Sequence, residues 1–304
     1  MTLVIGTDEA GYGPNLGPLV VAATAWRVAA TAEGCETAFA AAQAADVPWG
    51  DSKRVYRGGG MAALETGALV GLALAGGGRP ADAAAVAAAF GNLGPDREPR
   101  SWAAIAVPHA AEPAEVERLE PRVGAALAGQ GIALLAIRCR VIAASEFNRA
   151  LDGGLNKADL LSQSTLQLAA ELRGQFAAEP AVVWCDRHGG RRRYAGLVAR
   201  HFGEPLVSVI AETAARSAYE VPAAGCRIEF SVGGESRMPV ALASMTAKYL
   251  RELAMVDFNA EWCRRVPGLA PTAGYPVDAL RWRNAAAAAV DRAGVPWDDL
   301  WRRA

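Results

Sequence analysis

The chain has 304 residues, a formal net charge of -1 and 52% hydrophobic residues. These values argue against a multi-domain array, a strongly basic protein and a membrane-spanning protein. This length suits one large domain, with or without an insertion, rather than a multi-domain array. The balanced charge gives no global positive field, so any binding of nucleic acid must depend on local patches. The longest apolar run, Met61 to Ala75, carries Glu65 and is too short to span a bilayer. The first residues contain neither a basic segment nor a cleavage site, so we expect a cytoplasmic protein with no membrane partner.

The rare residue types narrow the choice of metal chemistry. Five cysteines are scattered singly and only three histidines occur, which leaves too few ligands for an ordinary zinc site. We therefore expect reduced, buried thiols and, for any bound metal, a hard cation held by oxygen. Lys53, Lys157 and Lys248 are the only lysines in a chain rich in arginine. Each of these lysines either makes a contact that requires an ammonium group or has been retained by chance.

The first part of the chain predicts two strands followed by an insertion. Leu3 to Thr7 is rich in β-formers and ends at the glycine and proline cluster Asp8 to Pro14, which predicts a tight turn. Leu19 to Val28 predicts the second strand. The Ala/Gly-rich stretch at about residues 55–130, with a loop expected at Gly91 to Arg100, is interpreted as an insertion within the domain.

The second part of the chain alternates strands and helices. The predicted elements are a strand at Ala133 to Ile142, a helix from Leu160 to Phe176, a buried strand from Ala181 to Cys185 that ends at Asp186, a strand at Leu206 to Ile210, a more exposed strand at Arg227 to Val232 and a long amphipathic helix from about Arg237 to Cys263. The remainder is predicted to be helical. This pattern predicts a single α/β domain over residues 1–304, with a mixed central sheet flanked by helices and a helical C-terminal part.

Four acidic residues stand at positions where strands end or a helix begins. Asp8 and Glu9 follow the first strand, where side chains alternate between faces, so only one is certain to face a site unless the strand bends. Asp186 ends another strand, at the edge where α/β sheets usually bind ligands. Glu235 precedes the long helix, whose positive end favours an acid even without a site. Each acid taken singly also fits an ordinary solvated turn or loop.

Together the four acids point to metal chemistry. Like charges about 4 Å apart repel by several kcal/mol at intermediate dielectric, and divalent cations would relieve that repulsion. Mg²⁺ and Mn²⁺ take carboxylate oxygen, and two such ions about 4 Å apart stabilise the attacking and leaving oxygens of phosphoryl transfer. The chemistry therefore indicates phosphodiester hydrolysis.

The motifs around these acids resemble one family. Val4 to Pro14, followed by Gly17 to Ala23, resembles the N-terminal signature of the type 2 ribonucleases H, ribonuclease HII and HIII. Further similar segments are Asp51-Ser52-Lys53, Phe147-Asn148 with Asn156 to Leu166, Val182 to Asp186, Gly234 to Arg237, Ala243 to Lys248 with Arg251-Glu252, and Gly274-Tyr275-Pro276. The resemblance covers both ends and the middle of the chain and leaves about residues 55–130 unmatched.

The resemblance implies a fold, an activity and a set of site residues. It implies a ribonuclease H-like fold and hydrolysis of the RNA strand of an RNA–DNA hybrid duplex at a two-metal Mg²⁺ or Mn²⁺ site. The implied catalytic and metal-binding residues are Asp8, Glu9, Asp186 and Glu235. The expected substrate-binding residues are Gly11, Tyr12, Gly13, Lys53, Arg191, Ser236, Lys248 and Tyr275. Tyr275 resembles the family tyrosine that packs on the sugar at the cleavage site, and we expect the protein to act as a monomer.

Three departures from the family pattern leave alternatives open. Tyr12 stands where the family usually has arginine, although that turn acts there largely through its backbone. Glu235 replaces the aspartate of ribonuclease HII, as in ribonuclease HIII, so the subtype stays open. Arg187 to Tyr194 is unusually basic and is interpreted either as a phosphate-binding loop or as a solvated one. The alternative functions are a non-catalytic nucleic-acid-binding protein of this fold, which the intact acids disfavour, and a nuclease for another structure such as a branched duplex.

Overall fold

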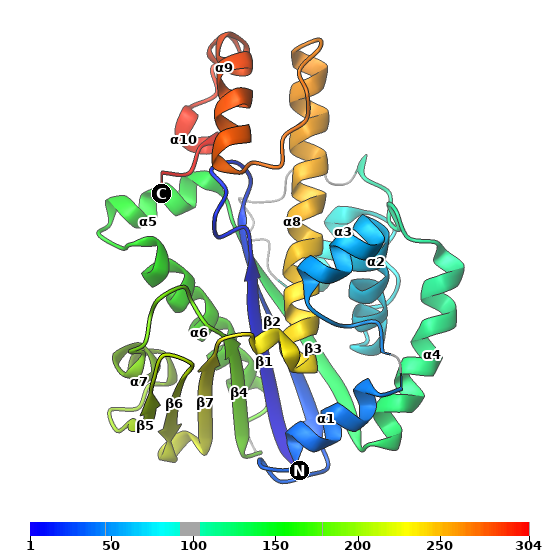
Figure 1. Cartoon of the computed structure of the whole chain (residues 1–304), viewed down its shortest axis with the longest axis vertical. Helices are drawn as coiled ribbons and strands as arrows, with labels where there is room; N and C mark the ends of the chain where they lie inside the picture. Colours follow the sequence, from blue (N-terminus) through cyan, green and yellow to red (C-terminus); the bar gives the residue numbers. More distant parts are fainter. Residues whose placement is uncertain (46, 92–103, 178, 304) are drawn as a thin grey trace.

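The computed structural model describes residues 1–45, 47–91, 104–177 and 179–303. Its described strands form one seven-stranded sheet in the order β3-β2-β1-β4-β7-β6-β5 (Figure 1). The strands are β1 (Thr2–Ala10), β2 (Leu19–Val28), β3 (Ile132–Ile142), β4 (Ala181–Asp186), β5 (Ser208–Glu212), β6 (Arg216–Val221) and β7 (Cys226–Ser231). β1 is antiparallel to β2 and parallel to β4, and β4 is parallel to β7. The mixed central sheet confirms the predicted α/β class.

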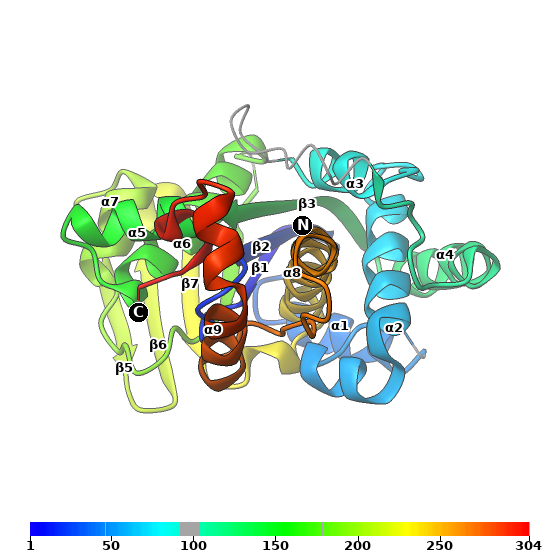
Figure 2. The same cartoon turned by 90° about the horizontal axis from the view of Figure 1, so that it is seen from above.

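Helices cover both faces of the sheet (Figure 2), and α8 and α9 extend beyond one end of it (Figure 1). They are α1 (Cys35–Gln43), α2 (Ser52–Leu74), α3 (Ala83–Ala89), α4 (Pro113–Gly129), α5 (Ala144–Asp152), α6 (Lys157–Gln175), α7 (Ala195–Phe202), α8 (Met238–Arg265), α9 (Pro276–Arg292) and α10 (Trp297–Leu300). Alternating side chains of each strand supply the two cores: Val4 and Trp184 pack with α2 and α8, whereas Ile5 and Val183 pack with α6. A third cluster joins the end of α8 to α9, as predicted for a helical C-terminal part.

The long helix α8 is fixed against the strands that carry the acids. Its first turn contains Pro239. Proline suits this position because backbone N–H groups in the first turn of a helix have no acceptor within the helix, so the N–H that proline lacks is not needed. The Pro239 carbonyl accepts a buried hydrogen bond of 2.8 Å from Thr24 Oγ1 of β2. The segment before α8, including Glu235, is therefore held near the centre of the sheet.

Several strand boundaries differ from the sequence-based prediction. The predicted turn at Asp8 is wrong, because β1 continues to Ala10, which pairs with Val20 of β2. β6 was not predicted. The strand predicted to be more exposed, now β7, is instead an interior strand between β4 and β6 and is largely buried. The exposed strand is β5, which lies at the edge of the sheet and is shifted by two residues from its predicted position.

The stretch interpreted as an insertion contains α3, α4 and most of α2. Leu64 of α2 and Val116 of α4 belong to the same core cluster as the sheet residue Val4. The buried Glu65 carboxylate accepts hydrogen bonds from three consecutive backbone N–H groups, at 2.6–2.8 Å, and from the Tyr249 hydroxyl of α8, at 2.8 Å. Apart from Gly91, the loop expected at Gly91 to Arg100 lies outside the described residues. No helix in the described ranges has the length and apolarity needed to cross a membrane.

Candidate active site

Asp8 lies inside β1, with its side chain on the face of the sheet that α8 covers. It is 7% exposed, and one carboxylate oxygen, Oδ1, accepts a hydrogen bond of 2.7 Å from the Glu9 backbone N–H. The nearby Ser244 hydroxyl of α8 favours its charged form and lowers its pKa, an effect that burial outweighs. Ser244 Oγ also lies 2.9 Å from Ser52 Oγ, at the start of α2. Two serines from distant segments therefore help to orient Asp8.

Asp186 is the last residue of β4, the strand that runs parallel to β1. Its Oδ1 accepts a hydrogen bond of 2.9 Å from the Gly234 backbone N–H. A Cβ atom at position 234 would lie only 3.0 Å from the Asp186 Cα atom, so glycine permits this close approach. The contact brings the short 3₁₀ helix Gly234–Ser236, and with it Glu235, beside the end of β4.

The four carboxylates, Asp8, Glu9, Asp186 and Glu235, interact electrostatically. Burial, and then the Asp186 charge, raise the pKa of Glu9 to about 7, and Glu235 adds to the effect. Burial raises the pKa of Asp186 to about 6, again with a contribution from Glu235. The pKa of Asp8 is raised well above its ordinary value by burial and then by the charges of Glu9 and Asp186. The parallel pairing of Thr7 with Cys185 and the hydrogen bond from Gly234 to Asp186 place these acids near one another, and the shifts reflect their interaction, although strand alternation made only one of Asp8 and Glu9 certain to face a site.

The donor set fits a hard divalent cation. All of its members offer carboxylate oxygen, and Glu9 Oε2 is buried without a hydrogen-bond partner. Within the described ranges, however, no group of three or more His, Cys, Asp or Glu side chains is already arranged to hold one ion. Binding of a cation would therefore draw the carboxylates closer together and relieve the repulsion that, after burial, raises the pKa values of Asp8, Glu9 and Asp186.

The turn after β1 carries Gly11, Tyr12 and Gly13. Gly11 has φ +85°, and a Cβ atom there would clash with the Pro18 carbonyl and lie 2.9 Å from Arg251 Cδ. The Lys157 ammonium lies 4.5 Å from the centre of the Tyr12 ring, a cation–π contact that brings a positive charge to this turn.

Tyr275 lies beside this turn and is 51% exposed. A Cβ atom on Gly13 would lie 3.9 Å from the tyrosine ring. The carbonyl of the preceding residue, Gly274, accepts hydrogen bonds from the backbone N–H groups of Asn15, at 2.8 Å, and Leu16, at 3.2 Å. The predicted sugar-packing tyrosine and the predicted recognition turn therefore form one surface.

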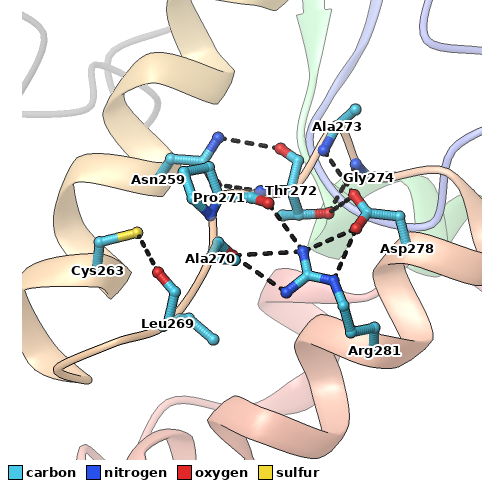
Figure 3. Close-up of polar contacts among 10 residues, drawn as sticks. All are labelled: Asn259, Cys263, Leu269, Ala270, Pro271, Thr272, Ala273, Gly274, Asp278 and Arg281. Atoms are coloured by element: carbon cyan, nitrogen blue, oxygen red, sulfur yellow. Dashed lines mark hydrogen bonds and ion pairs between the residues drawn. The ribbon is translucent and has the colours of Figure 1, made fainter.

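A network of polar contacts fixes the loop that presents Tyr275 (Figure 3). Asn259 of α8 exchanges two hydrogen bonds with the Thr272 backbone, at 2.9 and 3.0 Å. Asp278 of α9 accepts hydrogen bonds from Thr272 Oγ1 at 2.6 Å and from the Ala273 N–H at 2.8 Å. Arg281 binds Asp278 at 2.7 Å and also donates to backbone carbonyls of the loop. Both α8 and α9 thereby hold the loop in place.

The remaining residues predicted to contact the substrate differ in whether their side chains are exposed or already paired within the protein. Ser236 is exposed next to Glu235, and Lys53 is exposed near Glu9 and Asp186, whose pKa values its charge lowers. Lys248 forms an ion pair with Glu252.

The basic loop after β4 is largely committed to internal contacts. Arg191 is half-buried and forms an ion pair with Asp159 of α6. Arg187 donates to the Arg191 carbonyl at 2.8 Å and to the Ala214 carbonyl. Of the four arginines in this loop, only Arg192 and Arg193 are exposed. The phosphate-binding interpretation therefore applies at most to those two side chains directly.

Several residues that shape the site were not singled out from the sequence. Ser52, Ser244 and Gly234 lie inside motifs that carried the family resemblance, so their positions were a usable signal. His188, one of the three histidines, was not assigned a role from the sequence; it is buried, and its Nδ1 lies 2.9 Å from Ser162 Oγ. Nothing in the sequence pointed to Arg302, which contacts the turn after β1 from the other end of the chain.

The chain is similar in structure to solved ribonucleases H. It is 16% identical to Bst-RNase HIII, solved in complex with Mn²⁺, at a TM-score of 0.46. That match covers 99% of this chain and 66% of the other chain, so this chain spans just under two thirds of the length of that protein. It is 13% identical to a chain of the PCNA:RNase HII complex from Archaeoglobus fulgidus, at a TM-score of 0.44 and coverages of 98% and 93%. It is 15% identical to ribonuclease H2 from Pyrococcus horikoshii OT3, at a TM-score of 0.42 and coverages of 98% and 92%. No protein-family model and no curated protein sequence matches the chain.

Proposed function

We propose that this chain is a metal-dependent endoribonuclease of the type 2 ribonuclease H family, which hydrolyses the RNA strand of RNA–DNA hybrids. The observation that carries the proposal is the convergence of the four carboxylates at the ends of β1 and β4 and before α8. The raised pKa values of Glu9 and Asp186 reflect burial and mutual repulsion, the cost that bound cations would offset. The motif resemblance supports the family.

The four carboxylates would hold two Mg²⁺ or Mn²⁺ ions. When bound, such ions neutralise developing charge on the phosphate and lower the pKa of a water molecule. The chain itself orients the carboxylates: the Gly234 N–H binds Asp186, and Ser244 binds Asp8. Lys53 adds a positive charge beside Glu9 and Asp186. These groups prepare the site before the substrate arrives.

Recognition of RNA would take place next to the carboxylates. The turn Gly11 to Gly13 presents backbone groups that can approach a ligand closely, and the 2′-hydroxyl is the group that marks a ribonucleotide. Tyr275 offers an exposed ring on the same surface, suited to packing on a sugar. Ser236 and Lys248 are proposed as further substrate contacts, and Lys248 would exchange its ion pair with Glu252 for a contact with the substrate. We further propose that the protein acts as a monomer in the cytoplasm.

A panel of substrates tests the proposal. The purified protein is incubated with an RNA–DNA hybrid, a duplex with one embedded ribonucleotide, a branched DNA duplex and plain DNA duplex, each with Mg²⁺ or Mn²⁺. We expect cleavage of the RNA strand of the hybrid and none of plain DNA. Preferred cleavage of the branched duplex would instead favour another nuclease activity. Binding of the hybrid without any cleavage would favour the non-catalytic alternative.

A further inference from the structure

The first turns of α2, residues Ser52 to Gly59, form an exposed basic spur beside the carboxylates. Lys53, Arg54 and Arg57 are all exposed, whereas most of α2 beyond the spur is buried in the core. Gly60 separates the two parts, because its φ of 63° and ψ of -152° are not helical and suit glycine alone. The helix therefore bends at Gly60, and α2 lies beside α8 (Figure 1).

The spur is firmly anchored at its start. The side chain of Asp51 caps the helix and accepts hydrogen bonds from the N–H groups of Lys53, at 2.8 Å, and Arg54, at 3.2 Å. The contact of 2.9 Å between Ser52 Oγ and Ser244 Oγ ties this cap to α8. Ser244 also lies near Asp8, whose pKa it lowers, so the start of the spur is packed close to the carboxylates.

Arg54 and Arg57 of the spur have no acidic partner among the described residues, whereas the Lys53 charge interacts with Glu9 and Asp186, and Glu252 lies near Tyr56. Among the described residues, Lys53, Arg54 and Arg57 form no ion pair, and the Arg57 side chain donates only to the Lys53 carbonyl, at 3.2 Å. In contrast, the arginine-rich loop after β4 directs Arg187 and Arg191 inward. In a chain of net charge -1, the spur therefore provides a local positive surface of the kind that binds a polyanion.

We propose that the Ser52 to Gly59 spur binds the phosphate backbone of the nucleic acid that occupies the carboxylate site, with Arg54 and Arg57 making the contacts. The proposal rests on the proposed function, because it takes the substrate to be nucleic acid, and it adds the surface that binds it. Four acids alone repel phosphate, so a flanking basic surface offsets that repulsion while metals bind. Tyr56, between the two arginines, is instead engaged by α8, because the Lys248 ammonium lies 4.8 Å from the centre of its ring.

The experiment measures binding without cleavage. Fluorescence anisotropy gives the Kd of a labelled RNA–DNA hybrid in EDTA over a range of KCl concentrations. For the double variant Arg54→Gln/Arg57→Gln, we expect the slope of log Kd against log salt to fall by about two, since each phosphate contact contributes about 0.9. Kd at low salt should rise on the order of tenfold. An unchanged slope overturns the proposal.

Two further variants make the result specific. Arg54→Lys/Arg57→Lys retains both charges and should keep the wild-type slope. Arg149→Gln/Arg200→Gln removes two exposed charges from α5 and α7, on the opposite face of the sheet, and should also keep the wild-type slope.

The binding and cleavage results together separate the two proposals. A protein that cuts RNA but shows no effect of the spur variant contradicts only the role of the spur. A protein that shows the spur effect but cuts nothing contradicts only the proposed function, and a wild-type protein that binds no hybrid contradicts both.

Discussion

Arg302 donates a hydrogen bond of 2.6 Å to the carbonyl of Gly11, which lies 291 residues earlier in the chain. The same guanidinium group donates to the Pro14 carbonyl, and the Arg302 N–H binds the Asn15 carbonyl at 2.8 Å. Arg302 is fully buried, and this burial, followed by the charge of Arg251, lowers its pKa to about 9. The C-terminal segment thus holds the turn that is proposed to recognise RNA.

Arg302→Met is expected to destabilise the protein and impair its use of substrate. It leaves the carbonyls of Gly11 and Pro14 without their donor, and hydrogen bonds to charged groups contribute about 1.5–3 kcal/mol. We expect the free energy of unfolding, measured with urea, to fall by about that amount, and KM for the hybrid to rise more than kcat falls. Arg303→Met is the matched control, because Arg303 forms half-exposed ion pairs with Asp152 and Asp298. Equal effects of the two substitutions would refute this role of Arg302.

Gly11→Ala should lower activity on every RNA-containing substrate. An alanine at φ +85° is strained, and its Cβ would clash with the Pro18 carbonyl, so the turn must shift. We expect similar fractional losses of kcat/KM on a full hybrid and on a duplex with one ribonucleotide. Tm is measured in parallel, to show that the protein remains folded under the assay conditions. Full activity on either substrate would show that the turn does not contact RNA.

Tyr275→Ala should mainly impair cleavage at a single embedded ribonucleotide, because the ring can pack there on only one ribose. The ratio of kcat/KM on the two substrates should therefore change, unlike for Gly11→Ala. Asp278→Asn should change the ratio in the same direction but less, because it weakens the network that holds the Tyr275 loop (Figure 3). If Tyr275→Ala lowers both activities equally, or neither, the tyrosine does not discriminate between them.

The stability of the metal-free protein should fall as pH rises. Glu9 has an ordinary pKa of 4.5 and a folded-state pKa of about 7, so the folded state binds its proton more tightly than the unfolded state does. This contribution is fully present below pH 4.5 and is lost as pH rises through about 7. Asp186, whose pKa is raised to about 6, likewise lowers the stability of the metal-free protein as pH rises.

Thermal unfolding in EDTA and in Mg²⁺ measures this effect. We expect Tm in EDTA to be higher at about pH 5 than at about pH 8, and Mg²⁺ to raise Tm more at the higher pH, where the carboxylates are charged. Glu9→Gln should reduce the pH dependence in EDTA. A Mg²⁺ effect independent of pH would show that these carboxylates do not bind the ion.

The sequence predicted the site better where local pattern determines position than where distant segments meet. Asp186 was placed correctly because a run of buried β-formers ends there. The boundary of β1 was wrong because glycine and proline begin just after it, while pairing with β2 carries the strand on to Ala10. β6 was missed because its alternation is weak and its burial comes from its neighbours in the sheet. The contact between Arg302 and Gly11 depends on tertiary packing, which no local motif encodes.

The convergence of Glu9 with Asp186 shows the same limit. Strand alternation made only one of Asp8 and Glu9 certain to face a site, yet both interact with Asp186 in the folded protein. The hydrogen bond from Gly234 to Asp186 was likewise invisible, although the glycine stood in a recognised motif. Motif resemblance predicted the candidate site residues, whereas the structure supplied the contacts that orient them.

Asp186 and Glu235 should differ in their contribution to activity. Glu235 has the longer side chain and lies on the 3₁₀ helix, whereas Asp186 is fixed by the Gly234 N–H at the end of β4. We expect Glu235→Gln to lower kcat less than Asp186→Asn does, with saturating Mg²⁺. A larger loss for Glu235→Gln would reverse the proposed ranking.

Cleavage of an RNA–DNA hybrid by the wild-type protein and by Asp186→Asn, at saturating Mg²⁺ or Mn²⁺, tests the central claim most directly. An amide keeps the shape of the side chain but removes the negative charge that a divalent cation needs. We predict that the wild-type protein cuts the RNA strand, and that the variant, with an unchanged circular dichroism spectrum, loses activity on the order of a hundredfold or more. Near-normal turnover by the folded variant would contradict the account.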